Sequence, residues 1–135
     1  MDRKTARAQA MKLVYEWEMG GDGGEDTRLA LLEVKPGERG ADFMNALLEG
    51  VQTNVSGIDE WIGRFVHGWT LDRLTRVDLA ILRLAAYELM YTDTSKRIVI
   101  NEAVELANQY STDKAGAFVN GVLGNLARAL EDERE

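Results

Sequence analysis

Basic side chains near the N-terminus form the clearest candidate binding site in this sequence. Arg3, Lys4 and Arg7 fall within about 100° of one another on a helix. With Lys12, they oppose only Asp2 in the first fifteen residues, so this segment carries +3 and the remaining 120 residues carry −10 of the total −7. Such side chains pair with phosphates and make affinity depend on salt. An anionic ligand is one explanation, and a solvated helix face, which is commoner at this spacing, is the other.

Two aromatic side chains flank a short polar segment that separates two helical patterns. Tyr110 precedes the turn Ser111–Asp113 and Phe118 follows it. Aromatic rings beside such a turn can stack on unpaired bases. Packing in the core is the alternative, and it is the stronger one for Phe118. The residue types therefore suggest RNA binding without requiring it.

The composition argues against catalysis. Cysteine is absent and His67 is the one histidine, so thiol chemistry, zinc-thiolate sites and multi-histidine metal sites are excluded. No phosphate-binding loop, zincin motif or nucleophile elbow is present. Glu102 and Glu105, one turn apart, are more typical of a solvated face or helix caps than of an acid/base pair. We therefore predict a protein that is not an enzyme and has no cofactor or metal.

Helical periodicity dominates the chain, and 135 residues suit a single domain over residues 1–135. The sequence has no apolar stretch long enough for a transmembrane helix and no signal peptide, which predicts a cytoplasmic protein away from membranes. A capping-box pattern at Ser56–Asp59 predicts that a helix begins there. The pattern 71–92 is apolar on nearly all sides and predicts a central buried helix. Helices are expected over seven segments: about 3–18, 28–34, 39–54, 56–67, 71–92, 96–109 and 115–130.

Three segments resemble one known family. They are WTLDRLTRVDLAILRLAAYEL at 69–89, INEAVELA at 100–107 and FVNGVL at 118–123, and the opening from Ala6 to Trp17 is similar as well. In order and spacing they resemble the NusB family. The resemblance implies an all-α fold of about seven helices in two packed bundles. It also implies a transcription antitermination factor that binds boxA-type single-stranded RNA of ribosomal RNA leader transcripts together with the ribosomal protein NusE.

The resemblance also implies other Nus factors and RNA polymerase as indirect partners, and a homodimer as one state of the free protein. A helical protein-interaction adaptor with weak or no RNA binding is the alternative function. Asp78 would face NusE, and we expect its reversal to lysine to weaken that complex with little change in melting. Thr5 stands where the family often has a further arginine, and Lys114 could compensate with a phosphate contact. The residues expected to contact RNA are Arg3, Lys4, Arg7, Tyr110, Lys114 and Phe118.

Overall fold

Helices account for all the regular structure in the described part of the chain. The structure is a computed structural model, and it describes residues 1–21, 27–28, 33–35, 37–68 and 70–134. Within these ranges there are five α-helices and one 3₁₀ turn, and no strand. The predicted all-α class is confirmed, but the expected number of seven helices is wrong. The elements are α1 (Arg3–Glu18), α2 (Ala41–Gly63), η2 (Leu71–Arg73), α3 (Arg76–Tyr91), α4 (Lys96–Tyr110) and α5 (Ala115–Arg134).

The third and fourth predicted helices are one continuous helix, α2. Ser56, predicted to begin a new helix, lies within α2 and is exposed. A serine can occupy such a position when its hydroxyl points to water. Val51, Ile58 and Ile62 are fully buried, so the apolar stripe continues across the predicted boundary. The helix expected over 28–34 falls largely on residues 29–32, outside the described residues, and residues 33–35 are not helical.

The N-terminus of the central helix lies five residues later than predicted. Residues 71–73 form the separate turn η2, and Thr75 is the N-cap of α3. Its hydroxyl accepts a hydrogen bond from the Asp78 backbone N–H at 3.1 Å. Threonine in an extended conformation is a favourable N-cap because it satisfies one of the free amides of the first turn. The change of direction between η2 and α3 brings Arg73 and Thr75 toward the end of α4.

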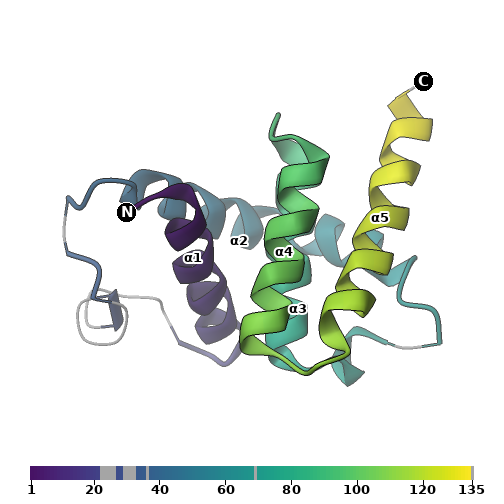
Figure 1. The fold of residues 1–135 in the computed structure, drawn as a ribbon, viewed down its shortest axis with the longest axis horizontal. Coiled ribbons are helices and arrows are strands. Elements are labelled where there is room, and N and C mark those ends of the chain that lie inside the picture. The colour runs from purple at the N-terminus through teal and green to yellow at the C-terminus, as the bar shows by residue number, and fades with distance from the viewer. Residues whose placement is uncertain (22–26, 29–32, 36, 69, 135) are drawn as a thin grey trace.

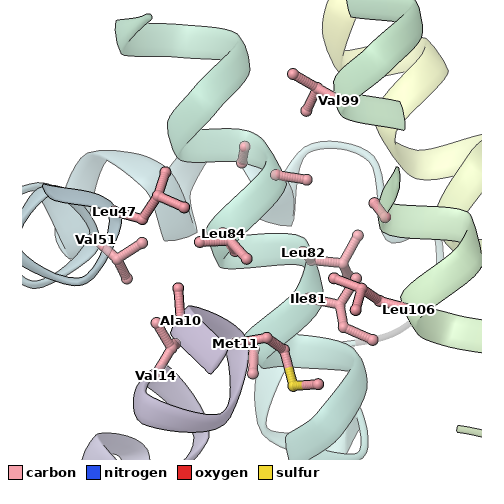
Figure 2. Close-up of a cluster of buried hydrophobic side chains, with 14 of the residues drawn as sticks. Ala10, Met11, Val14, Leu47, Val51, Ile81, Leu82, Leu84, Val99 and Leu106 are labelled. Atoms are coloured by element: carbon pink, nitrogen blue, oxygen red, sulfur yellow. The ribbon is translucent and has the colours of Figure 1, made fainter. Parts of the chain in front are cut away.

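Helix α3 is the common core of two helical groups. Residues 78–86 along it are all buried, which confirms the predicted central helix. One group packs α1 and α2 against α3, and the other packs α4 and α5 against it; α1 and α5 lie on opposite sides of α3 and α4 (Figure 1). Leu84 points toward Leu47 and Val51 of α2, while Leu82 lies toward Leu106 of α4 (Figure 2). None of the helices described is long and apolar enough to span a bilayer.

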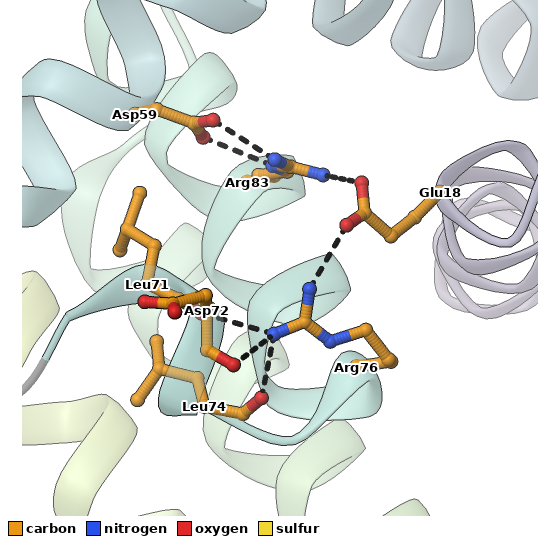
Figure 3. A network of polar contacts seen from close by, with 7 residues as sticks. All are labelled: Glu18, Asp59, Leu71, Asp72, Leu74, Arg76 and Arg83. Atoms are coloured by element: carbon orange, nitrogen blue, oxygen red, sulfur yellow. Dashed lines mark hydrogen bonds and ion pairs between the residues drawn. The ribbon is translucent and has the colours of Figure 1, made fainter.

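A polar network fastens the first group of helices together (Figure 3). Arg83 of α3 donates to both Asp59 carboxylate oxygens, at 2.9 and 2.8 Å, and to Glu18 at 2.7 Å. Arg76 donates to the other Glu18 oxygen at 2.9 Å. Hydrogen bonds hold the pKa of Glu18 below its ordinary value, and the bond from Arg83 has a larger effect than the bond from Arg76. The second Arg76 nitrogen donates to the carbonyls of Leu71, Asp72 and Leu74, so the network also fixes η2.

Candidate nucleic-acid interface

Three of the predicted site residues line one pocket. Asp78, Lys114 and Phe118 are brought together where the start of α3 meets the turn between α4 and α5. The pocket has a volume of about 370 Å³. Lys114 is exposed and Phe118 is half-buried. The remaining lining residues are Arg73, Leu74, Thr75, Thr112 and Ala115.

The lining of this pocket combines the groups that bind an unpaired nucleotide. Phe118 offers a ring for a base to stack on, and Arg73 and Lys114 offer cations for phosphates. Thr75 and Thr112 add hydroxyls that can donate or accept hydrogen bonds. The pocket is therefore large enough and chemically suited for one base with its flanking phosphate.

A glycine lies close to α4 at the start of α5, one turn before Phe118. A Cβ on Gly116 would lie 2.3 Å from the Asn108 side-chain oxygen of α4, a distance that real side chains do not reach. A side chain at this position would require the exposed Asn108 side chain to move away. Ala115, the first residue of α5, is buried. Phe118 follows one turn of helix later, and its ring reaches the pocket.

Asp78 has a structural role in addition to lining the pocket. It is 8% exposed, and one carboxylate oxygen accepts a 2.6 Å hydrogen bond from the Ser111 hydroxyl. Ser111 is the C-cap of α4, so the contact ties the end of α4 to the first turn of α3. A carboxylate in a first helical turn is also favoured by the helix dipole. This hydrogen bond argues against the expectation that lysine at this position leaves melting nearly unchanged, because lysine would lose both the hydrogen bond and the favourable interaction with the helix dipole.

The basic residues of α1 are not equivalent. Arg3 is exposed, and its guanidinium lies 3.9 Å from the centroid of the Phe43 ring. Lys4 is also exposed, and its ammonium pairs with Glu105 and lies 3.5 Å from the Glu102 carboxylate. Both cations remain accessible to solvent, so both remain candidates for phosphate contact.

Arg7 lies in the interior and has an acidic partner there. It is 6% exposed, and its Nε and Nη2 each donate to one oxygen of Glu88 at 2.9 Å. Hydrogen bonding to Glu88 raises the pKa of Arg7 further. Helical spacing correctly places Arg7 on the same side as Arg3 and Lys4, but one turn along α1 this side faces α3. The buried position argues against the RNA contact that the resemblance implied for Arg7.

Tyr110 lies between the α1 cations and the pocket. The Lys12 ammonium is 5.1 Å from the centroid of its ring. Lys4 approaches Glu102 and Glu105, and Lys12, eight residues later, approaches Tyr110, so α1 and α4 run side by side in the same direction. Lys4 and the pocket are therefore separated by about two turns of α4. The predicted residues fall into two groups. Arg3 and Lys4 lie at one end of the surface formed by α1 and α4, and Lys114 and Phe118 lie at the other.

Sequence reasoning missed four residues of this surface as candidates for the site. From the sequence alone, Lys12 contributes only to the charge of the N-terminal segment. Arg73, Thr75 and Thr112 line the pocket but carried no signal of their own. Arg73 and Thr75 reach it only because η2 precedes α3, a turn that the continuous helical pattern over 71–92 concealed.

Comparisons with known proteins agree with the sequence resemblance. The model of the NusB family matches residues 4–128. The chain is 39% identical to the transcription antitermination protein NusB of Natranaerobius thermophilus, over 99% of this chain and 100% of that protein. It is 41% identical to NusB of Acetivibrio thermocellus, over 95% and 90% of the two chains.

A solved structure extends the likeness to the fold. The crystal structure of the antitermination factors NusB and NusE in complex with double-stranded RNA contains a chain with a TM-score of 0.82 and 30% identity, covering 94% of this chain and 96% of that one. The family match spans residues 4–128, which include nearly all of α1, the whole of α2–α4 and most of α5. The chain belongs to the NusB family.

Proposed function

We propose that this protein is a transcription antitermination factor that binds boxA-type single-stranded RNA of ribosomal RNA leader transcripts together with NusE. The pocket that combines Phe118 with Lys114 and Arg73 carries the proposal, because it offers a stacking surface and two cations within one hollow. The solved complex of a family member with NusE and RNA supports both partners. The pair would act on elongating RNA polymerase with other Nus factors.

The RNA is proposed to follow α4 from the pocket to the start of α1. A base stacks on Phe118 while Lys114 and Arg73 contact flanking phosphates. The strand then passes Tyr110 and Lys12, whose ring and ammonium already lie together, and its phosphates end near Lys4 and Arg3. Arg7 supports this surface from within by holding α1 on α3 through Glu88.

The charge distribution suits two different partners. The cations of this path are local, whereas the chain as a whole carries −7. An acidic surface favours association with a basic ribosomal protein. Asp78 is proposed to face NusE at the edge of the pocket, so that RNA and protein would bind on adjoining surfaces.

Titration with a boxA-type RNA oligonucleotide over a range of salt concentrations tests RNA binding. If Arg3, Arg73 and Lys114 contact three phosphates, log affinity should fall against log salt with a slope of about −2. Replacing all three with alanine should flatten this slope toward zero. Phe118→Ala should instead lower affinity about fivefold or more at an unchanged slope, because stacking on one ring contributes about 1–3 kcal/mol.

The control for this titration is a scrambled oligonucleotide, which should bind more weakly, and added NusE should tighten the binding of the boxA-type RNA. Equal affinity for both oligonucleotides with and without NusE would contradict the proposal. That result would favour the alternative of a protein-interaction adaptor. The negative net charge and the pairing of Lys4 with carboxylates of the same chain support that alternative.

Asp78→Asn tests the NusE surface without a change of shape. The asparagine oxygen can still accept a hydrogen bond from the Ser111 hydroxyl, so the melting temperature should change little. Loss of the negative charge should weaken the NusE complex by roughly tenfold, about 1–1.5 kcal/mol. Calorimetric titration of purified NusE into each protein gives both affinities. Unchanged NusE affinity would place that interface elsewhere.

A further inference from the structure

Two acidic side chains of α4 pair with Lys4, a cation that the proposed function assigns to RNA contact. The Lys4 ammonium pairs with Glu105 and lies 3.5 Å from Glu102, one turn earlier on the same helix. The two carboxylates thus take the place that a phosphate would take beside Lys4. Hydrogen bonding to Glu105 raises the pKa of Lys4, so the lysine stays charged and the pair stays attractive.

This pair differs from the buried pair one turn along α1. Lys4 and Glu105 have side chains 61% and 59% exposed, whereas Arg7 and Glu88 are 7% and 2% exposed. Ion pairs between exposed groups contribute little to stability and open readily. A buried pair does not open without leaving an uncompensated charge. Lys4 can therefore exchange its partner, and Arg7 cannot.

We propose that Glu105 competes with the RNA for Lys4 and thereby limits the affinity of the RNA path. The inference depends on the proposed function, since the competitor matters only if phosphates approach Lys4. When a phosphate replaces Glu105, Lys4 gains one anionic contact and loses another. The phosphate also releases less counterion, because the carboxylate has already displaced solvent ions from the lysine. Lys4 then adds little to affinity until Glu105 moves away.

Glu105→Gln is the direct test, using the same boxA-type oligonucleotide. Removing the Glu105 carboxylate leaves Lys4 with only the longer contact to Glu102, at 3.5 Å. Affinity at low salt should therefore rise about two- to fivefold, the range that an exposed ion pair supports. The salt slope should become steeper by up to about 0.7, the value for one phosphate contact on a single strand. Without RNA, the pKa of Lys4 measured by NMR should fall toward its ordinary value.

Glu60→Gln is the matched control. Glu60 also pairs with a cation, Arg64 at 2.9 Å, and its side chain is 68% exposed, so the same charge and the same kind of contact are removed. Phe43 of α2 marks the position of Arg3, which lies over its ring. Glu60 is 17 residues farther along α2, which is about 25 Å along the helix. Its effect on RNA binding should be small. Lys4→Gln combined with Glu105→Gln should show no gain over Lys4→Gln alone.

The outcomes separate this inference from the proposed function. Wild-type binding with equal effects of Glu105→Gln and Glu60→Gln would overturn the competition and leave RNA binding in place. A gain that persists in the Lys4→Gln background would also overturn it, because the effect would not pass through Lys4. Binding by Glu105→Gln alone would support it strongly. Absence of binding in every variant would overturn both.

Discussion

Replacing Arg7 with methionine should lower the free energy of unfolding by about 3–5 kcal/mol, the range for breaking one side of a buried ion pair. Both members of this pair are inside the protein, with Arg7 6% and Glu88 2% exposed. Methionine fills a similar volume but donates no hydrogen bond, so the Glu88 carboxylate would lose both of its contacts of 2.9 Å. Chemical denaturation followed by circular dichroism measures the change.

Two further variants make this result specific. Combining Arg7→Met with Glu88→Leu should restore most of the lost stability, because an apolar pair replaces the ion pair without leaving a buried charge. Lys4→Met should cost less than about 1 kcal/mol, since Lys4 and its main partner Glu105 are exposed. If Arg7→Met left stability intact and instead flattened the salt dependence of RNA binding, Arg7 would be a phosphate contact and its structural assignment would fail.

The sequence predicted helices well where one pattern decided the outcome. Residues 79–86 of α3 are apolar at nearly every position, and only a helix covered on all sides can bury them. The break predicted near Ser56 failed because a capping motif is a local preference, whereas the stripe from Val51 to Ile62 continues to pack on α3. Burial of a continuous stripe outweighed the local signal.

The site was harder to predict because its partners are distant in sequence. Periodicity placed Lys4 and Arg7 on one side of α1, but Glu105 and Glu88, which determine their roles, lie 101 and 81 residues away. Nothing in the spacing of the basic residues distinguishes an exposed lysine from a buried arginine. The pocket has the same origin, since residues 73–78 and 112–118 meet only in the folded chain.

Arg83→Met should be the second most destabilising of these changes, with a loss of about 3 kcal/mol, at the low end for a buried pair. Arg83 joins Asp59 of α2 and Glu18 of α1 to α3, and its side chain is 9% exposed. Asp59 and Glu18 are each 26% exposed, so water can solvate part of the charge left behind. Arg76 also continues to hold Glu18. The expected loss is therefore smaller than for Arg7→Met.

Controls again distinguish the contact from the side chain's bulk. Arg83→Lys keeps the charge but cannot donate to Asp59 through two parallel bonds, so its loss should be intermediate. Arg64→Met breaks an exposed pair on α2 and should cost less than about 1 kcal/mol. A loss from Arg83→Met no greater than that from Arg64→Met would show that the network does not hold the three helices together.

Acid provides an independent test of the same network. Hydrogen bonds from Arg83 and Arg76 lower the pKa of Glu18 below its ordinary value of 4.5. A carboxylate with a lowered pKa in the folded protein contributes stability that is present above pH 4.5 and is lost as the pH falls through the folded-state pKa. In Arg83→Met the Glu18 pKa should rise toward its ordinary value, so the variant should lose less stability than the wild type on acidification. The two unfolding curves should therefore converge below pH 4.5, and parallel curves would contradict the assignment of Arg83 as the main partner of Glu18.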